Sequence, residues 1–83
     1  MSGPIVEIDL HGMNVEEAIA RVADEVLRAS SAVYVIRVIH GYNNGTRIKN
    51  AILEEYSYGR NPKVIKVRPG SNQGITELYL REL

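Results

Sequence analysis

The chain has 83 residues, 45% of them hydrophobic, and its ten basic residues balance ten acidic ones. A chain of this length has room for one small domain, with a core expected from about residue 5 to residue 81, and the balanced charge argues against the broad electrostatic attraction of a strongly basic nucleic-acid-binding protein. Any affinity for phosphate must therefore come from the local placement of side chains. The absence of cysteine excludes disulfides and thiolate metal sites.

The first predicted elements are a strand and a capped helix. Apolar and polar residues alternate over residues 5–10, as in a strand with one covered face. Gly12 then ends the strand, and Asn14 with Glu17 three residues later has the spacing of a capping box. Over residues 15–29 apolar side chains recur every three or four positions and predict an amphipathic helix. Its expected buried stripe consists of Val15, Ala18, Ile19, Val22, Ala23, Val26 and Leu27.

The rest of the chain predicts three strands and a second helix. Residues 33–39 are rich in β-branched side chains and predict a strand with little contact to water. A loop of glycine and asparagine leads to a helix over residues 46–57, and a strand is predicted over residues 64–68. The turn before the last strand, residues 75–81, is too short for a crossover, so that strand should run antiparallel.

These elements predict an α/β two-layer sandwich of order βαβαββ, with a four-stranded mixed sheet and two helices on one face. Right-handed crossovers place both helices on the same side of the sheet. They should cover Val6, Ile8, Leu10, Ile36, Val38, Ile65, Val67, Leu78 and Leu80. The face open to water should carry Glu7, Asp9, His11, Arg37, Lys66, Arg68, Glu77, Tyr79 and Arg81. Four basic residues and one aromatic on that face can meet phosphates and stack on a base.

Both histidines of the chain stand where a predicted strand gives way to a helix. The run Asp9-Leu10-His11-Gly12 ends the first strand, and His40-Gly41 ends the second. The carboxyl ends of parallel strands meet along one edge of an open α/β sheet, where sites usually lie. We therefore expect the two imidazoles to become neighbours at this edge.

Three side chains at this edge are candidates for catalysis. Asp9 and His11 leave the same face of a strand and can both touch one phosphodiester. His40 is a candidate second acid or base, because imidazole titrates near neutral pH and two histidines can move protons at one phosphate without a metal. Such a mechanism suits RNA, whose 2′-hydroxyl can act as an internal nucleophile.

Other interpretations of these side chains stay open. Asp9 can accept hydrogen bonds from loop amides while His11 bonds a backbone carbonyl, which is a purely structural role. His40 can equally be a loop residue that braces Gly41 and Tyr42. A facial metal triad of Asp9, His11 and His40 is a further alternative, so a divalent cation is not excluded, although no further carboxylate is placed to support it.

The candidate nucleic-acid-binding residues lie in the loops and on the open face. Amides and the helix dipole at a helix start favour an anion, and Arg47 and Lys49 follow such a start. Arg68 is the preferred phosphate contact. Tyr42 and Tyr79 are candidates for stacking, although Tyr79 can also fill cross-strand space. The full set is Gly12, Gly41, Tyr42, Asn43, Gly45, Arg47, Lys49, Lys66 and Arg68.

From about Val6 to Leu80 the chain resembles the Smr domain, the small MutS-related domain. The resemblance is carried by Ile8-Asp9-Leu10-His11-Gly12, a capped helix, Val38-Ile39-His40-Gly41 with its glycine-containing loop, and a closing glycine turn. It implies a two-layer fold, nucleic-acid binding and, as in several members, endonuclease (hydrolase) activity. It also implies that Asp9 and His11 belong to the cleavage motif and that His40 to Gly45 form the phosphate-approaching loop. Many members have His-Gly-x-Gly here, whereas Asn43 occupies the second glycine position of this chain.

We therefore predict a stand-alone Smr-type domain that binds structured or single-stranded DNA or RNA and cleaves it at Asp9 and His11. Loop amides and Arg68 are expected to stabilise the charge of the transition state. The alternatives are a non-catalytic module that recognises nucleic-acid structure and an adaptor that binds only protein. Because the sequence has neither a membrane-length apolar run nor a signal peptide, we expect a cytoplasmic protein. We also expect a monomer.

Overall fold

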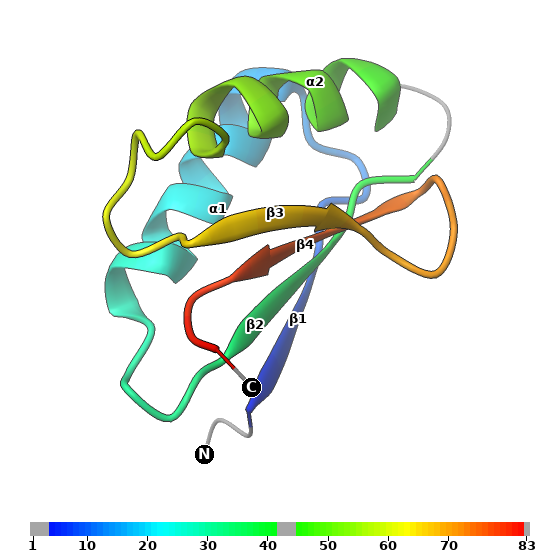
Figure 1. Ribbon diagram of the computed structural model, residues 1–83. Helices are drawn as coiled ribbons and strands as arrows, with labels where there is room; N and C mark the ends of the chain where they lie inside the picture. The colour runs from blue at the N-terminus through cyan, green and yellow to red at the C-terminus, as the bar shows by residue number, and fades with distance from the viewer. Residues whose placement is uncertain (1–3, 42–44, 83) are drawn as a thin grey trace.

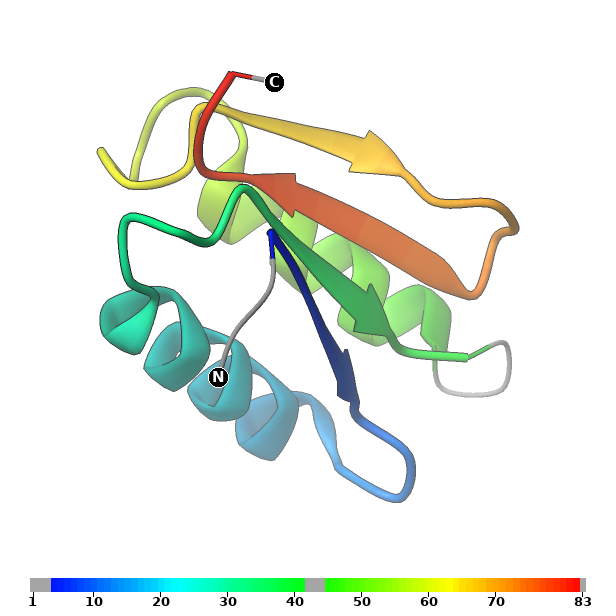
Figure 2. The same cartoon turned by 90° about the horizontal axis from the view of Figure 1, so that it is seen from below.

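The computed structural model describes residues 4–41 and 45–82. Its strands are β1 (Ile5–Asp9), β2 (Val35–Ile39), β3 (Lys66–Pro69) and β4 (Ile75–Tyr79), and its helices are α1 (Val15–Arg28) and α2 (Gly45–Tyr56). Both helices lie on one face of the sheet and leave the other face uncovered (Figures 1 and 2). The predicted order βαβαββ and the two-layer α/β architecture are therefore confirmed.

The sheet is mixed and has the strand order β1-β2-β4-β3. β1 and β2 pair in parallel, with Glu7 opposite Arg37 and Asp9 opposite Ile39. β4 lies between β2 and β3 and is antiparallel to both, which confirms the direction predicted from the short turn before it. β1 and β3 are therefore the outer strands, and the carboxyl ends of β1, β2 and β3 all point to the same end of the sheet (Figure 1).

The core lies between the sheet and the two helices. Strand residues of one parity face it, and each helix contributes one row of side chains spaced by four residues, which share a helix face. The buried strand residues include Ile8, Ile36, Val38 and Leu78, and the helix rows are Ala18, Val22, Val26 and Ile48, Ile52, Tyr56. Among the described residues, no helix is both long enough and apolar enough to cross a bilayer.

The first helix buries a narrower stripe than the sequence predicted. Leu27 is 74% exposed and Ala23 is also exposed, whereas both were expected in the core. Each lies one position beyond a buried valine, Val26 or Val22, which turns it about 100° away around the helix axis. The row Ala18, Val22 and Val26 is fully buried, Val15 and Ile19 pack against the core while partly buried, and the stripe leaves out Ala23 and Leu27.

The prediction that the helices cover Ile65 was wrong, because this residue is 46% exposed. β3 begins at Lys66 rather than at Val64. The Val64 amide donates to the Asn61 carbonyl at 3.1 Å, and after this turn Val64 takes the buried position in the core. The regular alternation of the strand therefore starts only after Ile65.

The predicted capping box of α1 is confirmed. The Glu17 amide donates to Asn14 Oδ1 at 2.8 Å, and the Asn14 amide donates to Glu17 Oε1 at 3.0 Å. Asn14→Ala removes the acceptor for a helix amide and is expected to lower the free energy of unfolding by about 1 kcal/mol in urea denaturation. The control is Asn50→Ala on the exposed face of α2, which should not destabilise because alanine has the higher helix propensity. Equal losses in the two variants would contradict a role for the cap.

Candidate functional site

The candidate site lies where β1 and β2 end side by side. The Leu10 amide donates to the Ile39 carbonyl at 2.9 Å and so ties the two strand ends together. Gly12 and Gly41, which follow the two histidines, have φ angles of 80° and 76°, a backbone conformation that side-chain-bearing residues rarely adopt. We call residues 9–12 and 40–41 the motif edge. It lies at the end of the sheet from which the chain continues toward both helices (Figure 1).

Asp9 shapes the first of the two turns through its carboxylate. The His11 amide donates to Asp9 Oδ1 at 2.9 Å, so one carboxylate oxygen holds the turn from which the His11 side chain projects. Both side chains are exposed. The structural role foreseen for Asp9, a hydrogen bond with a loop amide, is therefore present, and the His11 imidazole is accessible to a substrate.

His40 lies at the same edge but on the side of the sheet that the helices cover. Its residue is only 7% exposed, and it continues the buried positions of Ile36 and Val38 on β2. Nε2 lies 2.8 Å from Oγ1 of the buried Thr76, and Nδ1 lies 3.1 Å from the Gly41 carbonyl oxygen. Because a carbonyl only accepts, Nδ1 carries the hydrogen and donates it, while the Thr76 hydroxyl donates to Nε2 of the neutral ring.

The surroundings of His40 favour this neutral ring. Burial lowers the pKa of His40, the bond with the Gly41 carbonyl opposes that shift, and the positive charge of Lys49 adds to it. The structure thus brings the two strand ends together as expected, but it does not give them equivalent imidazoles. His11 is exposed, whereas both ring nitrogens of His40 are engaged within the fold.

The start of β4 anchors the second turn. The amides of His40 and Gly41 both donate to the Gly74 carbonyl, at 2.9 and 3.0 Å. The Gly41 amide, which was expected to meet a phosphate, is therefore already engaged. The predicted binding residues Tyr42 and Asn43 lie outside the described residues.

The first turns of α2 bring positive charge toward the motif edge. Gly45 is the first residue of this helix, and its first turn has no acidic residue. Arg47 is exposed and Lys49 is half-buried. The positive charge of Lys49 also lowers the pKa of His40, after the larger effect of burial.

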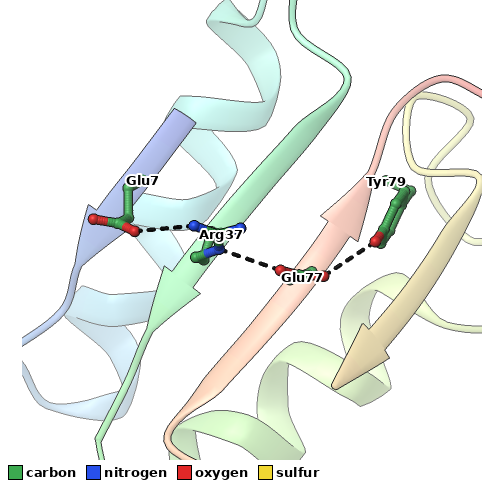
Figure 3. Close-up of polar contacts among 4 residues, drawn as sticks. All are labelled: Glu7, Arg37, Glu77 and Tyr79. Atoms are coloured by element: carbon green, nitrogen blue, oxygen red, sulfur yellow. Dashed lines mark hydrogen bonds and ion pairs between the residues drawn. The ribbon is translucent and has the colours of Figure 1, made fainter. Parts of the chain in front are cut away.

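A chain of polar contacts crosses the open face of the sheet (Figure 3). Arg37 donates from Nη1 to Glu7 at 3.4 Å and from Nε to Glu77 at 3.2 Å, and the Tyr79 hydroxyl donates to Glu77 at 3.1 Å. The hydrogen bonds with Glu77 and Glu7 raise the pKa of Arg37. The Lys66 ammonium lies 4.9 Å from the centre of the Tyr79 ring. Arg37, expected to meet phosphates, is therefore paired with carboxylates on both sides.

The strand order separates Arg68 from the first turn. Arg68 faces Glu77 on β4, which faces Arg37 on β2, which in turn faces Glu7 on β1. Three strand spacings put β3 about 14 Å from β1. Arg68 was expected to stabilise the transition state at Asp9 and His11, but it stands on the outer strand opposite to that of Asp9.

The facial metal triad finds no support in this geometry. Within residues 4–41 and 45–82, no three side chains of His, Asp or Glu lie close enough together to hold a metal ion. Both ring nitrogens of His40 are occupied, and its side of the sheet is not the side of Asp9.

The buried partner of His40 could not be found from the sequence. Thr76 stands 36 residues away, and no local pattern connects the two. The burial of His40 did have a signal, because His40 has the same strand parity as Ile36 and Val38, which were predicted to be covered.

Comparison with known proteins matches nearly the whole fold. A family model of the Smr domain matches residues 8–81, which span both turns of the motif edge. The crystal structure of the Smr domain of Thermus thermophilus MutS2 is similar, with a TM-score of 0.79 and 27% sequence identity over 93% of this chain and 99% of that chain. No match was found among curated proteins.

Proposed function

The chain belongs to the Smr domain family, which is known for nucleic-acid binding and nicking, and on this premise we propose that it binds DNA or RNA at the motif edge and cuts it slowly beside His11. One observation carries the proposal: the ends of β1 and β2 lie side by side, and each is followed by a turn that contains a glycine with positive φ. Asp9 holds the first of these turns, from which the His11 imidazole projects into water.

Binding is assigned to the space between the first turn and the start of α2. A helix start attracts an anion through its unpaired amides and its dipole. No acidic residue stands in the first turn of α2, and Arg47 and Lys49 add two positive charges there. A phosphate at this place is supported by local charge although the chain as a whole is neutral.

Cleavage is assigned to His11, with Asp9 as the residue that positions it. In an RNA strand, His11 takes the proton of a 2′-hydroxyl while that oxygen attacks the phosphorus, and the 5′ oxygen leaves with a proton from water. His40 can serve as a second acid only by leaving Thr76, so we assign it the role of positioning Gly41. With only one accessible imidazole, we expect the reaction to be slow.

One observation favours a second function, that of a non-catalytic module. A two-histidine mechanism needs both rings at the phosphate, and only His11 is exposed. A module that binds nucleic-acid structure without cutting it needs only the backbone turns and the basic side chains. A variant without His11 distinguishes the two functions. An enzyme loses cleavage of the bound nucleic acid, whereas a non-catalytic module is unchanged.

Binding should weaken with salt and depend on the first turns of α2. The double variant Arg47→Ala/Lys49→Ala is expected to lower the affinity about tenfold and to reduce the slope of log Kd against log salt by about one to two. The measurement is fluorescence anisotropy with labelled single-stranded RNA and duplex DNA. The control is Arg21→Ala/Arg28→Ala, which removes two charges that are paired with carboxylates on α1. If neither nucleic acid binds, or if both double variants lose the same affinity, the proposed interface is wrong.

Cleavage is tested on the same protein with branched DNA, single-stranded DNA and structured RNA. Each substrate is incubated with and without a chelator and resolved on a denaturing gel. Products that require His11 support an enzyme. Substrates that are bound and stay uncut under both conditions support the non-catalytic module instead.

A further inference from the structure

The loop between α2 and β3 presents an aromatic ring that the packing of the fold does not use. Tyr58 is 89% exposed, more than Leu27, Ile5 or Ile65, the other exposed large hydrophobic residues of the described chain. Its φ is 66°, and it is the one non-glycine residue with positive φ in the described segments. This backbone is unfavourable for an L residue, and an exposed ring recovers nothing by burial. A tyrosine at this position therefore costs stability, which points to a role outside folding.

The segment that contains Tyr58 has charge of only one sign. Between residues 56 and 76 the chain has four basic residues and no acidic one, although its net charge is zero. Lys66 and Arg68 stand two apart on β3 and so leave the same, open face of this outer strand. Arg60 is exposed in the loop beside Tyr58. We call Arg60, Lys66 and Arg68 the β3 stripe.

The fourth basic residue of the segment has a structural role. Lys63 Nζ donates to the Leu27 and Ala29 carbonyls at 3.1 and 3.2 Å and so caps the carboxyl end of α1. The β3 stripe therefore consists of the three other cations. Arg60 belongs to the loop that precedes β3, and Lys66 and Arg68 lie on β3, which ends at the same end of the sheet as β1 and β2, where the motif edge lies (Figure 1).

The part of the open face that β1 forms does not attract a polyanion. Glu7 and Asp9 stand on β1, and Arg37 on the neighbouring strand β2 is paired with Glu7 and Glu77. In the described part of the chain, by contrast, no ion pair involves Lys66 or Arg68 on β3. A nucleic-acid strand that reaches the motif edge over the open face therefore gains most by following β3.

We propose that Tyr58 stacks on a base of a single-stranded segment whose phosphates are held by the β3 stripe as the strand runs to the motif edge. The proposal rests on the proposed function, because it names the course of the strand bound there. Stacking on an aromatic ring needs an unpaired base and tolerates any sequence. The ligand is therefore a single strand, recognised by its bases and backbone charge rather than by sequence.

Tyr58→Gly separates binding from folding. Glycine adopts a positive φ without strain, so the melting temperature should rise or stay the same while the ring is lost. The affinity for a labelled oligouridine is expected to fall about tenfold in fluorescence anisotropy. Tyr58→Phe keeps the ring and should bind like the wild type. Leu27→Ala, which removes another exposed apolar side chain, should also leave the affinity unchanged.

The outcomes distinguish this proposal from the proposed function. If Tyr58→Gly binds oligouridine as tightly as the wild type, the stacking role is overturned, while the motif edge is still judged by the Arg47→Ala/Lys49→Ala variant. If Tyr58→Phe loses as much affinity as Tyr58→Gly, the ring is not the contact and stacking is again overturned. If the wild type binds no nucleic acid, both proposals fail.

Discussion

Replacing His11 with alanine is expected to lower the rate of strand cleavage by about 100-fold or more, the usual effect of losing a positioned general acid or base. Binding should stay within about twofold, because the phosphate contacts proposed here come from the start of α2 rather than from the imidazole. Single-turnover cleavage on a denaturing gel and anisotropy on the same substrate measure the two effects. Cleavage by His11→Ala at the wild-type rate would show that the reaction, if present, does not use this residue.

Asp9 offers a matched pair of variants for the same site. The Asp9 carboxylate accepts from the His11 amide, and an asparagine side-chain oxygen can accept the same bond without the charge. If Asp9 positions His11 by holding the turn, Asp9→Asn should keep most of the cleavage rate and Asp9→Ala should lose it. Equal loss in both variants would mean that the negative charge itself acts on the chemistry, and the positioning role would be wrong.

Local patterns in the sequence were sufficient for most of the fold. The capping box at Asn14, the alternation in β1 and the short turn before β4 each specify an element through contacts between near neighbours, and the structure has all three. The errors arose where coverage by a second layer decides burial. Leu27 and Ile65 are apolar and suitably placed along their elements, but nothing packs fully over them.

The candidate site was predictable only up to the level of the strand ends. The approach of the two His-Gly turns follows from parallel pairing, whereas the partners of Arg37 depend on the order β1-β2-β4-β3, which no local pattern specifies. The same order moves Arg68 away from the first turn. The burial of His40, by contrast, follows from a local pattern, because the strand alternation that predicts a covered Val38 also applies to His40.

The largest effect on stability is expected at His40. His40→Ala removes a ring from the buried side of the sheet and leaves the Thr76 hydroxyl without its partner. The lost hydrogen bond and the cavity together should lower the free energy of unfolding by about 3 kcal/mol. A domain of this size is stable by roughly 4–12 kcal/mol, so this loss is a large part of its stability. With the entropy of unfolding typical of such a domain, the melting temperature should fall by about 10–20 °C. His11→Ala, an exposed control, should change stability by no more than about 0.5 kcal/mol.

The pH dependence of stability tests whether the His40 ring is neutral in the fold. Burial holds the pKa of folded His40 below the ordinary value of 6.5 that it regains on unfolding. As the pH falls below about 6.5, the unfolded chain therefore binds a proton at this imidazole while the folded ring stays neutral. Proton binding stabilises the unfolded state, so the free energy of unfolding falls. The contribution of the neutral His40 ring to the free energy of unfolding is thus complete above about pH 6.5 and is lost as the pH falls toward the pKa of the folded state.

His40→Gln isolates this contribution, because glutamine can bond Thr76 but cannot titrate. Urea denaturation of the wild type between pH 8 and pH 5 should show a loss of stability that His11→Ala retains and His40→Gln reduces. The carboxylates titrate in all three proteins, so the difference between the curves belongs to the imidazole. If His40→Gln and the wild type lose stability in parallel, the His40 ring takes up its proton as readily when folded as when unfolded, and its place in the buried bond with Thr76 would be wrong.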